Sequence, residues 1–511
     1  MPQQTFRSAA RLGAALAALA LFGAPRAAAA QDGGGLTLDR VVSRAMEGSP
    51  QILAVVARAD AVRARALAAA GRFDLRLGAS VSGTQQSAFE AGQAGLQAAT
   101  THTAAYELNA TRQFRSGIVV QPRVTVSRTA REGAAAADAG SSVSLSVAVP
   151  LLRDRFGRAS TAGERAARLR ADAVRLDVRY ATDVGVNQAV GAYWDYVAAH
   201  ARLEVYAQAE ERARRRLEET RALVAGDERP AADLTPLDAA LARAGQQRIA
   251  AEQAVEEARA NLGLAMGLEL AETAALPAPG TPFPAAAAWS PGAADAERLA
   301  RLALERRGDY VATRMELSSD EVLLAGAREE LKPRLDLQLS MGYAGRRLGS
   351  GYGGLVEPLY RDVPGLNASV RVDWQLPVAR TEARGLAAQA EAQRAEKAAD
   401  VADRARHITA SVALLVQSLS RGAAAVEHAE RAVALYRTTV ENEQQKNRLG
   451  AATLFDVIYA EDNLTGALLS EVAGRLAYAK ALAQLRVETG TLAEDTADGP
   501  AVDPARLLSR P

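Results

Sequence analysis

The chain has 511 residues, 49% of them hydrophobic, and its 61 Lys and Arg against 60 Asp and Glu give a net charge of +1. This near-neutral balance gives no basis for nucleic-acid binding, and without the three arginines of residues 1–30 it becomes 58 basic to 60 acidic residues. The absence of cysteine excludes disulfide bonds, thiol chemistry and a lipid anchor on cysteine, so packing alone must hold the fold.

Residues 1–30 have the pattern of a secretory signal peptide. Arg7 and Arg11 form a basic start, residues 13–24 form an apolar core, and small residues precede a cleavage position near Ala30. The core is too short to span a bilayer, and no later stretch approaches 18 uncharged apolar residues. We therefore expect an exported protein without a transmembrane helix; the alternative for residues 1–30 is a disordered Ala-rich tail.

The next segment, residues 49–83, predicts a charged Ala-rich helix that leads into an alternating strand. Leu77 and Val81 alternate there with small and polar residues, and a second alternating strand at residues 142–152 ends at Pro150. A sheet with one apolar and one polar face fits a soluble sandwich, whose apolar face meets another sheet, or a membrane barrel, whose apolar face meets lipid.

Residues 106–127 resemble an additional hairpin between these two strands. It could extend the barrel wall above the membrane, fold as an external loop or add strands, and Pro122 argues for an edge position. The corresponding segment later in the chain, residues 345–365, is rich in glycine, and we interpret it as a surface loop.

Two long helices follow, at about residues 163–223 and 237–266, and they are joined by a turn at residues 224–236. The same order of elements then occurs again, because residues 308–345 parallel 49–83 and residues 368–378 parallel 142–152. An internal duplication of this kind sets the domain organisation. The predicted units are a signal peptide (1–30), a first repeat (36–270), a Pro/Ala-rich linker (271–296), a second repeat (297–490) and a C-terminal tail (491–511).

The long helix of the second repeat has a coiled-coil seam. From Ile408 to Val440, apolar or small residues recur in steps of 3 and 4 over more than four heptads, while the other faces are charged or polar. A helix of roughly 65 residues is about 100 Å long, so it cannot belong to one compact core. Gly450 interrupts the pattern, and a further helix follows it.

Three segments resemble the TolC-like outer-membrane efflux proteins. These are "AYWDYVAAHARLEVYAQAEERARRRLEETRALV" (residues 192–224), "LGAATLFDVIYAEDNL" (residues 449–464) and "QLPVARTEAR" (residues 375–384), in which Ala379 and Arg380 replace a usual Gly-Asn pair. The resemblance covers about residues 36–490, and it depends on the order of elements more than on any one motif.

The resemblance implies a mainly α protein with membrane β-strands. In a homotrimer, each chain would contribute four or more strands to a shared twelve-stranded barrel in the outer membrane, and the coiled-coil hairpins would form a hollow α-barrel in the periplasm. A physical argument also requires oligomerisation if the sheet lies in a membrane, because four strands cannot close a barrel and open strand edges are not tolerated in lipid. The implied function is a passive exit duct of a tripartite efflux or type I secretion system, without enzymatic activity or cofactor. Its partners would be a periplasmic adaptor (membrane fusion) protein and an inner-membrane pump of the RND or ABC type.

The family also suggests roles for the hairpin tips farthest from the outer membrane. The adaptor would dock at residues of the two turns, namely Gly226, Leu449, Gly450, Ala451, Thr453 and Leu454. Asp456 and Asp233 would form the pore constriction, with Asp456 repeated as an anionic ring by threefold symmetry. Asn447 and Ala452 stand where the family can use a tyrosine and an arginine, so the family's gate network is not expected. The alternative for the second turn is a simple helix end and restart, with Thr453 and Asp456 as its cap.

No catalytic or metal-binding pattern emerges, because the four histidines lie far apart and paired carboxylates such as Glu461–Asp462 lie on charged helices, where we expect them to be solvated. Two other protein classes remain possible. A soluble periplasmic adaptor would have one hairpin flanked by compact lipoyl-like and barrel domains, and a structural coiled-coil stalk would not need strands with a lipid-like face.

Overall fold

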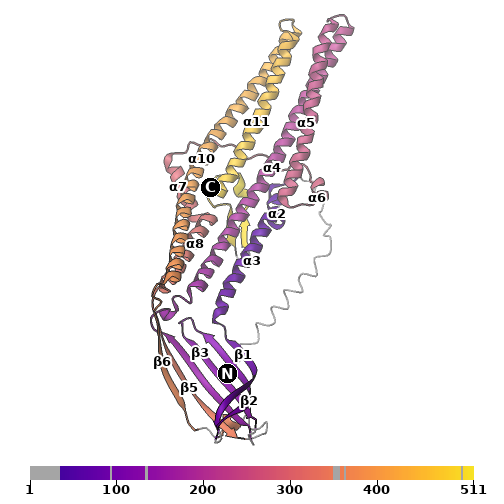
Figure 1. Ribbon diagram of the computed structural model, residues 1–511. Coiled ribbons are helices and arrows are strands. Elements are labelled where there is room, and N and C mark those ends of the chain that lie inside the picture. Colours follow the sequence, from indigo (N-terminus) through magenta and orange to yellow (C-terminus); the bar gives the residue numbers. More distant parts are fainter. Residues whose placement is uncertain (1–34, 93–94, 133–135, 349–356, 362–363, 497–498) are drawn as a thin grey trace, which may run out of the picture.

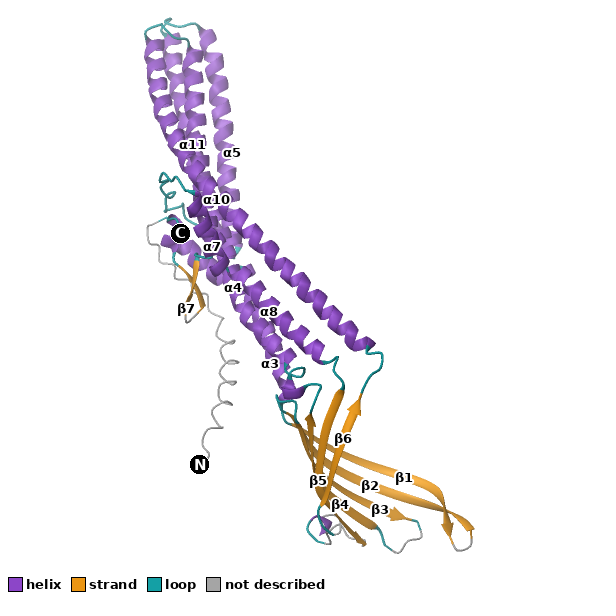
Figure 2. Ribbon diagram, turned by 90° about the vertical axis from the view of Figure 1, so that its left-hand side faces the viewer, coloured by secondary structure: helices purple, strands orange, loops and turns teal. Residues whose placement is uncertain are grey.

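The computed structural model describes residues 35–92, 95–132, 136–348, 357–361, 364–496 and 499–511. The predicted signal peptide and part of the predicted glycine-rich loop lie outside these ranges. Figure 1 shows a sheet at one end of an elongated molecule and the tips of two helical hairpins at the opposite end. Helices connect these two ends, and a two-stranded sheet packs beside them (Figure 2).

The helices follow the duplicated order predicted from the sequence. In the first repeat they are α2 (Leu38–Gly48), α3 (Pro50–Ala70), α4 (Ala162–Ala225), α5 (Leu234–Met266) and the short α6 (Leu270–Ala274). In the second repeat they are α7 (Ala293–Arg306), α8 (Gly308–Glu329), α10 (Thr381–Arg448) and α11 (Leu454–Glu488). The predicted long helices and the predicted break at Gly450 are therefore confirmed, and the α4–α5 and α10–α11 pairs form the two hairpins.

The seam of α10 differs in part from the predicted one. Its positions seven residues apart, from Val412 through Leu419 and Val426 to Val440, are all buried, but Tyr436 is exposed. Towards the sheet, α7 packs beside α11 against α10. A helix with two neighbours needs a wider apolar face than a two-helix seam, which is why Val416 is buried there as well.

One helix of the described residues, α10, is long and apolar enough to cross a membrane by length and composition alone. The most apolar part of α10 still contains Arg421 and several polar residues, so it is not a run of 18 uncharged apolar residues, and the absence of a transmembrane helix stays a prediction. A single such helix, found by length and composition alone, is weak evidence of a membrane span, and Ile408, Val412 and Leu419 of α10 pack against the neighbouring helices.

The large sheet has six strands, which confirms the expectation of four or more strands. They are β1 (Arg76–Gly92), β2 (Gly95–Gln113), β3 (Val119–Arg131), β4 (Asp138–Pro150), β5 (Arg334–Leu348) and β6 (Asn367–Gln375). The strands lie in chain order and every neighbouring pair is antiparallel. The residues predicted as an additional hairpin, 106–127, thus lie in β2 and β3, in the interior of the sheet.

Pro122 lies in β3 between two partner strands, so its predicted edge position was wrong. It is paired with Leu145 of β4, while the β2–β3 pairing is interrupted between Arg123 and Val120. A proline cannot donate to a ladder, so this local gap is its structural consequence.

The described sheet ends at β1 and β6, which have no further partner strand within the described ranges. Many apolar side chains of one face are exposed, among them Leu77, Leu108, Met341 and Trp374. An exposed apolar face of this extent on a chain that is otherwise packed indicates contact with lipid or with another protein.

The largest core cluster lies midway along the helices, where the two repeats meet. Trp194 of α4 is fully buried and stacks on Phe283 of the linker, with ring centroids 5.6 Å apart. The hydroxyl of Tyr193 donates to the carbonyl oxygen of Leu36 over 2.9 Å. The C-terminal segment, with β7 (Ala493–Thr496) and β8 (Gly499–Val502), also packs here, because Leu507 is fully buried in the same cluster. The linker and the tail therefore fix the middle of the helical body and leave its two ends free.

Candidate functional site

The second hairpin tip is a tight helix-to-helix turn. Helix α10 ends at Arg448, and Gly450 adopts φ +75°, a left-handed conformation that favours glycine. The N–H of Ala451 donates to the carbonyl oxygen of Lys446 over 2.8 Å, which closes the last turn of the helix. A Cβ atom added to Gly450 would meet nothing within 4 Å. The backbone conformation, and not crowding within this chain, is therefore what requires glycine at the tip.

Thr453 and Asp456 form the predicted cap of α11. The Asp456 carboxylate accepts from the backbone N–H of Thr453 over 2.8 Å and from its hydroxyl over 2.7 Å, while the N–H of Asp456 donates to the Thr453 hydroxyl. These hydrogen bonds from the side chain and backbone of Thr453 lower the pKa of Asp456 below its ordinary value. The Asp456 side chain is exposed at the tip and carries a negative charge throughout the neutral pH range.

The first hairpin tip is longer. After Gly226 the chain passes through Asp227, which adopts φ 58°, and a short helical turn that ends at Asp233 leads into α5. Asp233 lies 3.6 Å from the guanidinium of Arg229, so its charge is partly balanced within this chain. Asp456 is therefore the better placed of the two predicted constriction residues to act as an uncompensated anion.

Arg229 also joins the two tips. Its guanidinium donates to the side-chain oxygen of Asn447 over 3.0 Å, and the amide of Asn447 donates to the carbonyl oxygen of Ala452 over 2.9 Å. Asn447 and Ala452 are the two positions where the family can use a tyrosine and an arginine. In this chain both take part in a contact between the tips, and its arginine is Arg229 of the first hairpin.

Leu454 requires a correction as a predicted adaptor contact. Its side chain is buried in a small cluster with Leu217 of α4 and Leu237 of α5, so it holds the hairpins together and cannot be offered to a partner in this conformation. The exposed apolar side chains at the second tip are instead Leu449, which was predicted, and Phe455 and Tyr459, which were not.

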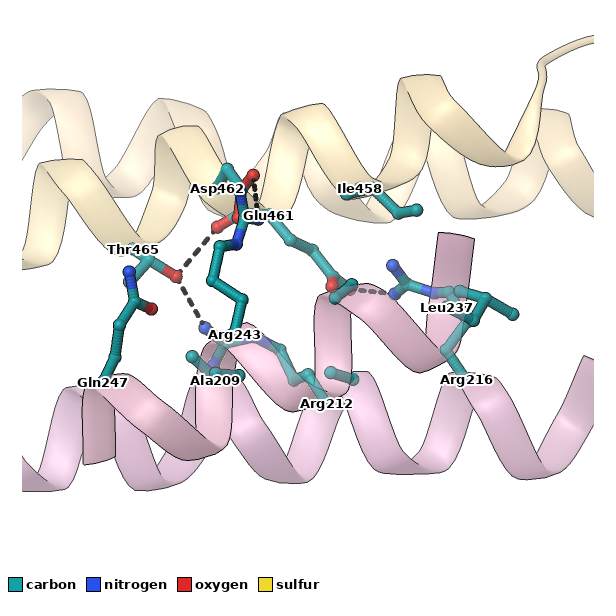
Figure 3. Close-up of a pocket in the computed structure, with 13 residues that line it drawn as sticks. Ala209, Arg212, Arg216, Leu237, Arg243, Gln247, Ile458, Glu461, Asp462 and Thr465 are labelled. Carbon is teal, nitrogen blue, oxygen red and sulfur yellow. Dashed lines mark hydrogen bonds and ion pairs between the residues drawn. The ribbon is translucent and has the colours of Figure 1, made fainter. Parts of the chain in front are cut away.

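Ion pairs between the hairpins are the part of the site that sequence reasoning missed (Figure 3). Arg216 of α4 forms an ion pair with Glu461 of α11, and both side chains are largely buried, with 13% and 11% of their surface exposed. Gln444 of α10 donates to the same Glu461 carboxylate over 3.2 Å. Glu461 is therefore not the solvated helix residue that was expected.

Two more arginines of the first hairpin reach α11. Arg243 of α5 donates to Asp462 over 2.6 Å in an exposed pair, and Arg212 donates to the hydroxyl of Thr465 over 3.1 Å. Burial lowers the pKa of the Arg212 guanidinium, and Arg216 adds to this effect, while Glu461 opposes it. The buried part of the contact thus contains two neighbouring guanidinium groups, those of Arg212 and Arg216, and one carboxylate, that of Glu461.

Two cavities adjoin this ion-pair network. The cavity between the hairpins, about 40 Å³, has room for a few water molecules only. Towards the tips, a wider cleft of about 610 Å³ is lined mainly by charged and polar side chains, including Arg215, Glu219 and Arg448. One small apolar cluster and several polar contacts thus join the tips. The two hairpins can therefore separate at the tips without exposing much apolar surface.

In the described ranges, no three His, Asp or Glu side chains come together in a way that could hold a metal ion. The chemistry of the tips is that of ion pairing and helix capping.

No protein-family model matches the sequence, and no curated protein matches it. The fold, however, is similar to solved structures. The outer membrane protein VceC of Vibrio cholerae is 17% identical with a TM-score of 0.65 over 89% of this chain and 96% of that chain. The open state of the MtrE outer membrane channel of Neisseria gonorrhoeae is 16% identical with a TM-score of 0.63 over 89% of this chain and 88% of that chain. The CmeC outer membrane channel of Campylobacter jejuni is 14% identical with a TM-score of 0.62 over 89% of this chain and 85% of that chain. The chain therefore has the fold of the TolC-like outer-membrane efflux channels.

Proposed function

We propose that the protein is an outer-membrane channel, the passive exit duct of a tripartite efflux or type I secretion system. The observation that carries this proposal is the pairing of two features at opposite ends of the molecule. An open sheet with an exposed apolar face lies at one end, and the tips of two helical hairpins lie at the other (Figure 1). A membrane end and a distant docking end are the two surfaces that such a duct needs.

The open sheet favours a homotrimer. Strand edges cannot be left unpaired in lipid, and β1 and β6 are both edges of a sheet that one chain cannot close. Symmetric copies that join edge to edge remove every free edge at once. The helices would then lie side by side around a common axis in the periplasm.

The tips favour docking of a periplasmic adaptor, which would couple the channel to an inner-membrane pump of the RND or ABC type. Leu449 and Phe455 are exposed there, next to Gly450, Ala451 and Thr453 of the turn. Apolar side chains at the end of a long polar hairpin provide a small contact surface of the kind that transient protein interfaces use. In this proposal the channel performs no chemistry, and the pump supplies the energy.

Fractionation and crosslinking test this proposal together. We expect the full-length protein in the outer-membrane fraction, extractable only with detergent, and we expect crosslinking in detergent to stop at three subunits. A monodisperse monomer that retains its full β content would contradict it, as would a soluble periplasmic protein.

The charge of Asp456 should control ion selectivity. Three copies around a narrow pore end would create a negative potential that attracts cations and divalent blockers. Asp456→Asn keeps the size and much of the capping ability of the side chain, so we expect weaker cation selectivity and weaker divalent block in planar-bilayer recordings. Because the pKa of Asp456 is lowered, the selectivity of the wild type should persist from pH 7 to pH 5.

Thr453→Val is the matched control for Asp456→Asn. It removes the hydroxyl that caps α11 but leaves the carboxylate in place. We expect it to lower the melting temperature and to keep the selectivity. Unchanged selectivity in Asp456→Asn, together with a lowered melting temperature, would assign Asp456 to the cap alone.

A further inference from the structure

Among the residues that the structure describes, the first repeat contributes four strands to the large sheet and the second repeat contributes two. By the internal duplication, β1 corresponds to β5, since both follow a helix that ends near the sheet, and β4 corresponds to β6, since both lead into a long helix. The β2–β3 hairpin lies between β1 and β4 in the sequence and in the sheet. Strand β2 pairs with β1 over the whole length of β1, from Arg76 to Gly92, and β3 pairs with β4 from Val119 to Thr129. The hairpin therefore separates β1 from β4 completely.

The β2–β3 hairpin continues the apolar face of the sheet. Residues that are direct partners across a sheet point to the same face, and one such row runs across five strands. The row consists of Ala79, Leu108, Val124, Val143 and Tyr343. The side chains that β2 and β3 contribute are as apolar as those of β4 and β5, so the face has no polar gap at the hairpin.

The hairpin also continues the polar face. The adjacent row consists of Ser80, Glu107, Thr125 and Ser142, and it ends at the small Ala344 of β5. An external hairpin would be in water on both faces and would need no such alternation. Alternation of lipid-facing and lumen-facing residues is instead the requirement for a strand of a membrane barrel wall.

We propose that all six strands lie in the membrane wall, so that the trimer forms an eighteen-stranded barrel. This inference rests on the trimeric channel proposed above and goes beyond it in the number of strands. The free edge of β1 pairs with the free edge of β6 in the next copy. Because β1 runs away from the helices and β6 runs back towards them, this junction is antiparallel like every other pair in the sheet.

The dimensions of the helical part agree with a wall of this size. Strands about 4.8 Å apart, tilted by about 45°, each take about 7 Å of circumference, so eighteen strands give roughly 120 Å and twelve give roughly 80 Å. Four helices per chain, α3, α4, α8 and α10, directly precede or follow strands of the sheet in the sequence and end next to it (Figure 1). Twelve helices spaced by about 8–10 Å make a ring of roughly 100–120 Å. An eighteen-stranded wall can therefore meet the helical ring with little taper, which leaves a wide lumen through the membrane.

The part of β1 and β2 beyond the apolar band extends the wall outward. On the face that is apolar near Leu77, the side chains become polar at Gln85 and Ser87 of β1 and at their partners His102 and Thr100 of β2. The opposite face is polar here as well, at Thr84 and Gln86 and at their partners Thr103 and Thr101, so this part of the hairpin lies beyond the hydrocarbon region, on the side away from the helices.

The cysteine-free chain allows a direct test with single spin-labelled cysteines. Val124→Cys and Thr125→Cys label the two faces of β3, and Leu339→Cys and Ser340→Cys label the two faces of β5, which lies in the wall in either arrangement. In reconstituted trimers, we measure the accessibility of each label to oxygen, which concentrates in lipid, and to a water-soluble nickel chelate. We expect Val124→Cys to match Leu339→Cys, with high oxygen accessibility, and Thr125→Cys to match Ser340→Cys, with high nickel accessibility.

The outcomes separate this inference from the proposed function. If Leu339→Cys is in lipid while both β3 labels are accessible to nickel, the hairpin lies outside the wall and the eighteen-stranded barrel is wrong. If Leu339→Cys is itself not in lipid, the membrane channel proposed above fails as well.

A crosslinked pair provides a second test that does not depend on labelling. Ala79 of β1 and Leu108 of β2 are direct partners, and a twelve-stranded barrel would require β1 to leave β2 and pair with β4. An Ala79→Cys/Leu108→Cys disulfide should therefore leave trimer formation and single-channel conductance unchanged relative to the reduced form. Loss of the trimer or of conductance on oxidation, reversed by reductant, would overturn the inference.

Discussion

Replacing Arg216 with methionine should release the two hairpins from each other at their tips. The guanidinium is largely buried against Glu461, and methionine fills similar volume without the charge. Removing one partner of a buried ion pair costs at most about 3–5 kcal/mol, and the hydrogen bond from Gln444 and the nearby Arg212 reduce this cost for Glu461. Since α4 and α11 meet near the tips mainly through this pair and the Leu217–Leu237–Leu454 cluster, we expect larger or more frequent openings in planar-bilayer recordings and a lower melting temperature.

Arg243→Met is the matched control, because Arg243 also joins the first hairpin to α11. Its pair with Asp462 is exposed, with 53% of each side chain accessible, and exposed pairs contribute about 0–1 kcal/mol. This variant should therefore resemble the wild type in conductance and in melting temperature.

A charge swap completes the test of the Arg216–Glu461 pair. The double variant Arg216→Glu/Glu461→Arg should recover part of the closed behaviour that Arg216→Met loses. If Arg216→Met opens no more than Arg243→Met, the buried pair does not restrain the tips.

The helical part of the fold could be predicted because its signals are local. The seam from Val412 to Val440 and the break at Gly450 depend on residues within a few turns of one another, and the structure has the same helices. The width of the seam could not be predicted, because it depends on α7. That helix lies about 100 positions earlier in the chain and reaches α10 only in the fold.

The number of strands in the sheet could not be predicted from the sequence for a related reason. Apolar Tyr106 and Leu108 alternate with polar Glu107 and Asn109 in the sequence. A strand with one apolar and one polar face can lie in a barrel wall or in an external hairpin. Only the pairing of β2 with β1 and of β3 with β4 decides that these strands lie inside the sheet. Pro122 suggested an edge strand, but an interior strand can contain a proline where the hydrogen-bond ladder has a local gap, as between β2 and β3.

The ion pair at Glu461 had a signal in the sequence that was overlooked. Glu461 follows Leu454 and Val457 and precedes Leu464 in steps of 3, 4 and 3, so it occupies a seam position. A carboxylate at a seam position requires a buried partner. The identity of that partner, Arg216, could not be read, because 245 positions separate the two residues.

Gly450→Arg should abolish export while leaving the channel in the outer membrane. A Cβ at this position meets nothing within 4 Å, so the side chain would project from the tip into the space that an adaptor would occupy. The sheet lies at the far end of α10, whose 68 residues span roughly 100 Å, so insertion and trimer formation should be unaffected. Tolerance of the compounds to which a deletion strain becomes sensitive would measure export, and surface labelling would measure insertion.

The left-handed backbone at Gly450 demands a control that separates strain from bulk. Any side chain at φ +75° strains the turn, at a cost of about 1–3 kcal/mol, but asparagine tolerates this conformation far better than most residues. Gly450→Ala carries the full backbone strain with almost no bulk, and Gly450→Asn carries a small polar side chain with little strain. If docking through the tip is correct, both retain export and only Gly450→Arg loses it. Loss of export in Gly450→Ala as well would assign the effect to the shape of the turn, and normal export in Gly450→Arg would show that no partner approaches the protein at Gly450.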